Sequence, residues 1–198
     1  MRELRLGITG GIGCGKSVVS RILGLMGIPV YDCDSEAKRL TQNNDEIRRS
    51  LISLLGDRVY DNHGILNKSF LASYVFSTPE HTERVNNIIH PIVKADFEDW
   101  AKEQLLDHPI IGLESAILFE SGLDDIVDKV LFVDAPLELR IRRTIQRDGS
   151  SLEQVKKRID AQMDSTEKMK HSHFVVVNDN KKSLISQVQG ILNELKGM

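Results

Sequence analysis

The sequence is poor in the features that mark membrane, exported or single-strand-binding proteins. Its 198 residues include two cysteines, Cys14 and Cys33, one tryptophan and only 5% aromatic residues. Two cysteines cannot form a disulfide framework, and no apolar run approaches the ~20 residues of a membrane-spanning helix. So few aromatics disfavour a stacking surface for single-stranded nucleic acid. We therefore expect no membrane or nucleic-acid partner and a location in the reducing cytoplasm.

Neither sign of charge dominates the chain. Lys and Arg number 26 against 29 Asp and Glu, a net charge of −3, whereas proteins that coat nucleic acid are usually basic. The first residues lead into glycines without the apolar stretch of a secretory signal. Hydrophobic residues make up 40% of the chain, enough for a packed core. With no linker-like segment, we expect one folding unit and a monomer or weak homo-oligomer.

Short apolar segments alternate with segments of helical spacing. Five apolar segments are predicted to be buried strands: 4–9, 29–31, 110–113, 129–133 and 174–177. Helices are predicted at 17–26, 136–147, 151–165 and 182–196. The segment 35–104 is predicted to be mostly helical, with breaks at 57–67, 78–79 and 90–91. Short apolar strands between helices predict an α/β fold, a five-stranded parallel sheet with helices on both faces.

The strongest motif follows the first predicted strand. Gly10-Gly11-Ile12-Gly13-Cys14-Gly15-Lys16-Ser17 satisfies G-x-x-x-x-G-K-[ST] between a strand and a helix. Such a loop turns several N–H groups toward one anion, and the following helix adds its dipole. Lys16 would reach the β- and γ-phosphates, and the Ser17 hydroxyl would ligate Mg²⁺. The alternative, a glycine-rich turn that contains Lys-Ser by chance, is disfavoured by this context.

The rest of the chain narrows the class of phosphate-loop protein. A GTPase needs an Asn-Lys-x-Asp segment, but Asn178-Asp179-Asn180-Lys181 has the wrong order. The small size and the helical insertion after the second strand favour a kinase that acts on a small molecule. An ATP-binding switch is the alternative outside catalysis.

Acidic residues follow the predicted strands, where parallel sheets bind ligands. Asp32 and Asp34 flank Cys33 and could accept the proton of an attacking hydroxyl, orient that hydroxyl, or bind Mg²⁺ through water. The alternative is that they cap the next helix. Glu114 ends the third strand and could hold the water shell of Mg²⁺, or be a solvated glutamate. Glu120 could orient substrate or pair with an arginine, and a purely structural role is the alternative.

A basic segment follows the fourth strand. Residues 138–158 carry seven basic side chains against three acidic ones, and Gly149-Ser150-Ser151 interrupts the helical pattern. Two helices joined by a hinge and carrying arginines are typical of a lid that closes over phosphates. The residues Arg140, Arg143 and Arg147 share one helix face, and functional use is predicted for the last two. A solvated face is expected for Arg142, Lys156 and Lys157.

Seven segments, in order along the chain, resemble the dephospho-CoA kinase family. They are Thr9–Ser17, Val30–Asp34, Ile88–Pro91, Leu113–Glu120, Arg143–Asp148, Arg158 with Gln162, and Val175–Asn178. Cys14 and Val18 depart from the more usual Ser and Thr without removing a backbone amide. Glu114 stands where the family more often has Asp, and Ala116 where it usually has Pro.

This resemblance implies transfer of the ATP γ-phosphate to the ribose 3′-hydroxyl of dephospho-CoA, giving CoA and ADP. Asp34 would be the catalytic base, with Lys16, Arg143 and Arg147 acting on the phosphates. The nucleotide would contact Gly11, Gly13, Cys14, Gly15, Lys16, Ser17, Val18 and Asn178, the last near the adenine. Mg²⁺ would bind at Ser17 and Glu114, and the acceptor would contact Asp32, Asp34, His90 and Glu120.

The same resemblance divides the single kinase unit into three parts. A core would comprise about 1–34, 106–138 and 166–198, with an acceptor-binding insertion at 35–105 and a lid at 139–165. His90 is also open to a second interpretation, a histidine at a helix boundary with a local hydrogen bond. Shikimate or gluconate remain alternative acceptors, although the His-Pro and Leu-Phe-Glu segments disfavour them.

Overall fold

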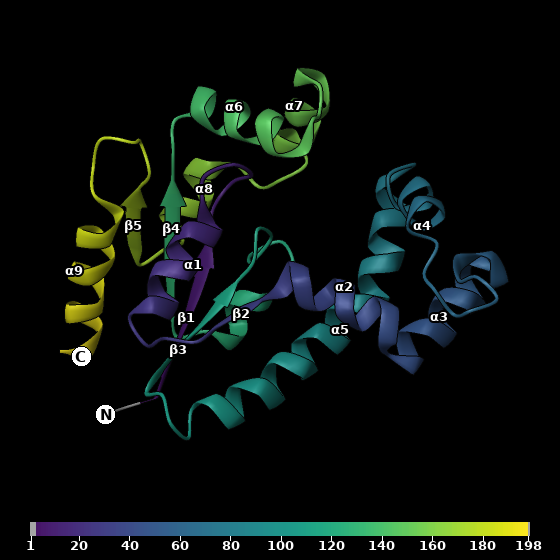
Figure 1. Ribbon diagram of the computed structural model, residues 1–198, viewed down its shortest axis with the longest axis horizontal. Coiled ribbons are helices and arrows are strands. Elements are labelled where there is room, and N and C mark those ends of the chain that lie inside the picture. The colour runs from purple at the N-terminus through teal and green to yellow at the C-terminus, as the bar shows by residue number, and fades with distance from the viewer. Residues whose placement is uncertain (1–2, 198) are drawn as a thin grey trace. The chain divides into compact units, whose positions relative to one another are not determined.

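The computed structural model describes residues 3–197, which form two compact units (Figure 1). The first unit is built from the chain up to Asp32 and from Ala101 onward, and the second is Cys33–Trp100. Among the described residues, no helix combines the length and apolar composition needed to cross a membrane.

The first unit contains a parallel sheet in the order β2-β3-β1-β4-β5, which confirms the predicted five strands. The strands are β1 (Leu4–Thr9), β2 (Val30–Asp32), β3 (Ile110–Glu114), β4 (Lys129–Asp134) and β5 (Phe174–Val177). β1 lies in the centre, and the chain continues to β2 on one side and later to β4 on the other. Such a reversal of strand order marks the place where open α/β sheets bind ligands.

Both faces of the sheet are covered, which explains why the strands are apolar throughout. Leu6 and Ile8 of β1 are fully buried in a core shared with α1 (Lys16–Leu25) and α9 (Leu184–Lys196). Gly7 faces the other side, where an added Cβ would lie 2.9 Å from Leu118. A glycine in mid-strand therefore admits the segment that follows β3.

The remaining helices of the first unit follow β4. They are α6 (Leu137–Asp148), α7 (Leu152–Asp160) and α8 (Ser165–Lys170), with a short 3₁₀ turn, η2, at Leu123–Ile126. The single helix predicted at 151–165 is wrong in its second half, because α7 ends at Asp160. The carboxylate of Asp164 accepts hydrogen bonds from the N–H groups of Thr166 and Glu167 and starts α8 instead.

The second unit is helical, as predicted, with an irregular stretch between its helices. Its elements are α2 (Cys33–Asn43), α3 (Asp45–Leu55), the 3₁₀ turn η1 (Asp57–Val59), α4 (Lys68–Val75) and most of α5 (Pro79–Gln104). The predicted break at His90-Pro91 is wrong, because α5 continues through Pro91. Val85, Val93 and Phe97 are buried along this helix, and their packing outweighs the hydrogen bond that proline cannot make.

Candidate phosphate-transfer site

The phosphate loop, Gly10–Ser17, connects the central strand β1 to α1. Gly13 and Gly15 have positive φ angles of 76° and 96°, which an L side chain rarely adopts. Both also touch other elements, since an added Cβ would lie 2.3 Å from the Arg140 carbonyl oxygen and 2.2 Å from Asn178 Nδ2, respectively. These glycines are needed for packing as well as for the curl of the loop.

The residues of the loop that are predicted to contact the nucleotide differ in how far their side chains are exposed. Lys16 Nζ donates a hydrogen bond to the Gly10 carbonyl at 2.9 Å, so its side chain folds back along the loop. Ser17 and Val18 are exposed at the first turn of α1. The Cys14 side chain belongs to the buried core, which leaves only its backbone for contacts on the loop surface.

Asn178, expected near the adenine, lies at the end of β5 against the phosphate loop. Its Nδ2 donates to the Cys14 carbonyl at 2.8 Å, and the residue is buried. Arg143 from α6 completes the contact, donating to the side-chain oxygen of Asn178 at 3.2 Å and to the Cys14 carbonyl at 3.4 Å. The structure thus brings Asn178 and Arg143 together on one side of the loop.

The other predicted lid arginine lies apart from this group. Arg147 Nε donates to Asp148 at 2.7 Å, and Asp148 also accepts from Arg158 Nη1 at 2.7 Å. These two guanidinium groups hold the pKa of the Asp148 carboxyl well below its usual range. The three side chains join the end of α6 to α7 across the glycine-containing turn.

Three contacts to the loop region were missed by the sequence analysis. Arg140 Nε donates to the Ile12 carbonyl at 3.0 Å, and Gln162 Oε1 accepts from the Ile12 N–H at 3.0 Å. Lys168 on α8 is fully buried and donates to the Ala116 carbonyl at 2.7 Å. The shared face of Arg140 and Arg143 and the family resemblance at Gln162 were the available signals, whereas nothing in the sequence pointed to Lys168.

Glu120 pairs with a lysine rather than with the arginine that was one of its predicted alternatives. Lys168 Nζ lies 2.7 Å from Glu120 Oε1, which also accepts a hydrogen bond from the Met163 N–H at 2.9 Å. Burial lowers the pKa of Lys168, and the Glu120 carboxylate acts in the opposite direction. Glu120 thereby ties the segment after β3 to the connection between α7 and α8.

Two of the predicted carboxylates stand at neighbouring strand ends. Asp32 ends β2 and Glu114 ends β3, and the two residues are register partners in the parallel ladder. Both are partly buried. Among residues 3–197 no group of three or more His, Cys, Asp or Glu side chains has the geometry of a metal cage. A hydroxyl and one or two carboxylates nevertheless suit Mg²⁺, which usually keeps waters and binds substrate phosphates.

The remaining predicted residues belong to the second unit. Asp34 is exposed in the first turn of α2, two residues beyond the end of β2. His90 is half-buried in the interior of α5, where burial lowers the pKa of its imidazole. The interpretation of His90 as a helix-boundary residue is therefore wrong.

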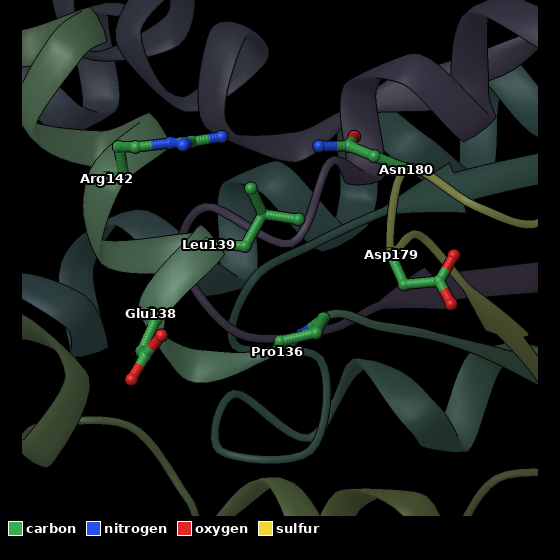
Figure 2. A pocket seen from close by; sticks show the side chains of 6 residues that line it. All are labelled: Pro136, Glu138, Leu139, Arg142, Asp179 and Asn180. Atoms are coloured by element: carbon green, nitrogen blue, oxygen red, sulfur yellow. The ribbon is translucent and has the colours of Figure 1, made fainter.

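A pocket of about 340 Å³ opens between the start of α6 and the segment that follows β5. Its lining consists of Pro136, Glu138, Leu139, Arg142, Asp179 and Asn180. Figure 2 shows Arg142 and Asn180 extending toward each other, with Leu139 between them. Asn180 has a φ of 64°, and its side-chain oxygen accepts a hydrogen bond from Arg143. The pocket and the phosphate loop therefore share Arg143 as a neighbour.

Comparisons with known proteins agree with one another. A family model described as dephospho-CoA kinase matches residues 4–183. A dephospho-CoA kinase from Bacteroides fragilis is 48% identical over 186 residues, covering 93% of this chain and 89% of the relative. A crystal structure from Thermus thermophilus superposes with a TM-score of 0.83 at 34% identity, covering 98% of this chain and 99% of that one. The structure of a dephospho-CoA kinase from Campylobacter jejuni superposes with a TM-score of 0.72 at 26% identity, and 98% of each chain is covered.

Proposed function

The chain belongs to the dephospho-CoA kinase family, and on this premise we propose how its residues carry out the reaction. The enzyme transfers the ATP γ-phosphate to the ribose 3′-hydroxyl of dephospho-CoA, which gives CoA and ADP in the last step of coenzyme A biosynthesis. The observation that supports our assignment of roles is the phosphate loop, which follows β1 beside the acidic ends of β2 and β3.

ATP binds with its phosphates on the loop and its adenine in the pocket beside it. Backbone N–H groups of the loop bind the phosphate oxygens, and Lys16 exchanges the Gly10 carbonyl for the β- and γ-phosphates. The pocket offers the apolar surface of Pro136 and Leu139 with the polar groups of Arg142 and Asn180, which suits a planar base. Asn178 then supports the loop from behind rather than touching the base.

Ser17, Asp32 and Glu114 are the residues that would hold Mg²⁺. Their hydroxyl and carboxylate oxygens are the ligands that this hard cation prefers, directly or through water. When bound, Mg²⁺ neutralises negative charge on the phosphate oxygens. Asp32 and Glu114 suit this role because adjacent parallel strands deliver both carboxylates to the same edge of the sheet.

Asp34 acts as the general base, and the second unit supplies contacts to the acceptor. The oxygen of the 3′-hydroxyl attacks the γ-phosphorus, its proton passes to the Asp34 carboxylate, and the bond from phosphorus to the β–γ bridging oxygen breaks. The exposed position of Asp34, two residues beyond β2, supports this role. His90 and Glu120 remain candidates for contacts to the acceptor.

Arg143 and Arg147 stabilise the charge of the transferring phosphoryl group. Arg143 already lies beside the loop, where its Nη1 donates a hydrogen bond to the Cys14 carbonyl at 3.4 Å. Arg147 is exposed at the end of α6 and reaches the phosphates when the helix pair α6–α7 moves toward the loop. Arginine fits both positions because its planar fork matches phosphate oxygens.

ADP release measured with ATP, Mg²⁺ and a panel of acceptors tests the reaction. Dephospho-CoA should support release, whereas shikimate, gluconate, AMP and no acceptor should not, and the product should have the mass of CoA. If ADP is released only with another acceptor, the protein is still a kinase, but the assignment of dephospho-CoA as its acceptor is wrong.

The variant Asp34→Asn tests the assignment of Asp34 as the general base. We expect kcat to fall roughly 10²- to 10⁴-fold, with ADP affinity retained, because the amide cannot accept the proton. Asp45→Asn is the matched control, since Asp45 is an exposed aspartate in the first turn of α3 of the same unit. Full turnover by Asp34→Asn would show that another group takes the proton.

A further inference from the structure

Ile12, in the middle of the phosphate loop, has both of its polar backbone groups bound by side chains. Its N–H donates to Gln162 Oε1 at 3.0 Å, and its carbonyl accepts from Arg140 Nε at 3.0 Å. Arg140 stands near the start of α6, and Gln162 follows the end of α7. Side chains from the two ends of the lid segment, 139–165, therefore meet at one residue of the loop.

Each of these side chains is held in place by a second contact. Arg140 is 7% exposed, and its Nη1 donates to the Ser165 hydroxyl at 3.1 Å. Gln162 Nε2 donates weakly to the Ala116 carbonyl at 3.4 Å, the oxygen that Lys168 Nζ also binds at 2.7 Å. Both side chains that bind Ile12 therefore make a second hydrogen bond within the first unit.

The loop lies close against α6 on both sides of Ile12. A Cβ added to Gly11 would lie 2.0 Å from Arg140 Nη2, and one added to Gly13 would lie 2.6 Å from Thr144 Oγ1. The two peptide groups that flank Ile12 therefore have little room to rotate. A shift of the part of α6 around Arg140 and Thr144 would therefore shift the loop as well.

The need to fill space does not by itself explain why residue 140 is an arginine. Among the described residues, the hydrogen bonds of the Arg140 guanidinium go to two neutral acceptors, the Ile12 carbonyl and the Ser165 hydroxyl. Burying a charged group against neutral partners is costly, and an apolar side chain of similar length would fill the space with less penalty. The directional hydrogen bond to Ile12 is what an apolar residue could not supply.

We propose that Arg140 and Gln162 are positioning residues, which orient the phosphate loop through Ile12 and couple it to both ends of the lid. By fixing the peptide groups around Ile12, they aim the neighbouring N–H groups at the phosphates. This inference rests on the proposed function only in that the loop binds the phosphates of the nucleotide.

Arg140→Met, Gln162→Met and the double variant test this role, since methionine keeps the length of each side chain. Each single variant should lower kcat roughly 10- to 100-fold, because small misplacements of reacting groups cost about that much. The Kd of ADP should weaken by about threefold to tenfold, because a hydrogen bond of roughly 1 kcal/mol no longer preorganises the loop amides that bind the phosphates. The KM of dephospho-CoA should stay within about twofold. The double variant should lose little more kcat than the worse single variant, because both act on one residue.

Gln42→Met is the matched control. Gln42 is also half-buried, accepts from the Leu66 N–H and donates to the Gly64 carbonyl, each at 3.0 Å, but within the second unit. It should lower thermal stability to a similar extent and leave the Kd of ADP unchanged. If Arg140→Met does not fold, Arg140→Lys replaces it, because lysine keeps the charge but not the geometry of the guanidinium.

Three results would overturn the inference. They are an unchanged Kd of ADP in both single variants, kcat losses that match the loss of folded protein, and losses that multiply fully in the double variant. The Kd of ADP does not depend on the acceptor. A wild-type enzyme that binds ADP but does not phosphorylate dephospho-CoA would therefore overturn the proposed function and leave the test of Ile12 intact.

Discussion

The two ends of α6 place their arginines in opposite environments, although both arginines face the same side of the helix. Arg140 is 7% exposed and binds the loop backbone, whereas the Arg147 side chain is 61% exposed and pairs with the adjacent Asp148. We call the first region the lid root, comprising Arg140, Arg143, Thr144, Gln162 and Lys168. The second is the lid tip, comprising Arg147, Asp148, Gly149 and Arg158.

The difference shows how one helix can serve two tasks. At the root, side chains bind backbone atoms of the loop and of the segment after β3, so they have few alternative partners. At the tip, charged side chains bind one another in water, where such pairs contribute little and exchange readily. A helix anchored at one end and solvated at the other can move at its free end without disturbing the loop.

The largest expected difference between root and tip comes from adding one methyl group to a glycine. Gly13→Ala puts a Cβ 2.3 Å from the backbone oxygen of Arg140 at a φ of 76°, and should lower the free energy of unfolding by roughly 3 kcal/mol or more. Gly149→Ala has a similar φ of 64° and open space around it, and should cost only about 1–2 kcal/mol. Urea denaturation of both variants measures the two costs. Equal losses would mean that the loop does not pack tightly on α6.

A somewhat smaller effect is expected for Lys168→Met. Removing a buried charge leaves Glu120 without its cation, and the free energy of unfolding should fall by about 2–3 kcal/mol, below the range for fully buried pairs because Glu120 is partly exposed. The control is Lys170→Met, whose exposed pair with Glu167 should contribute less than about 0.5 kcal/mol. Chemical denaturation measures the free energy of unfolding of both variants. A stability loss no larger than that of the control would contradict the importance of the root.

The smallest effect is expected at the tip, for Asp148→Asn. The free energy of unfolding should fall by less than about 1 kcal/mol at pH 7, because both arginine partners are about half exposed. The pKa of Asp148 is lower in the folded protein, so its contribution is complete above the unfolded pKa of about 3.9 and disappears as the pH falls through the folded pKa. About 1 M NaCl should remove most of the difference. A large loss that is insensitive to salt would place Asp148 with the root residues instead.

Local patterns along the chain were enough to predict most of the fold, and failures occurred where packing or a second local signal overrode them. Pro91 suggested a helix boundary, yet the buried residues around it carry α5 through the proline. The pattern at 151–165 suggested one helix, but the Asp164 carboxylate starts a new helix before the pattern ends. At Pro91 packing overrode a local signal, whereas at 151–165 one local signal, the Asp164 cap, overrode another.

The residues of the candidate site also fall into two groups, those that the sequence could predict and those that it could not. The phosphate loop, and the aspartates and glutamate after β2 and β3, could be read from the chain because each lies within a few residues of a strand end. The pocket lined by α6 and the segment after β5 could not, because it forms only where these two distant parts of the chain meet. The position of Asn178 near the adenine, which the resemblance implies, stays a prediction, and the structure adds that its amide donates to the Cys14 carbonyl.

The phosphate loop and the five parallel strands could thus be predicted from short contiguous stretches, since glycine turns, apolar strands and helix starts are local patterns. The reaction was implied by the resemblance of seven short segments to one family. The contacts that hold the loop depend on the tertiary structure alone. Arg140 and Ile12 are 128 positions apart, and Ile12 and Gln162 are 150 apart. No periodicity connects residues at such distances. Only the folding of α6, α7 and α8 over β4 and the loop brings a buried guanidinium and an amide to the same backbone residue.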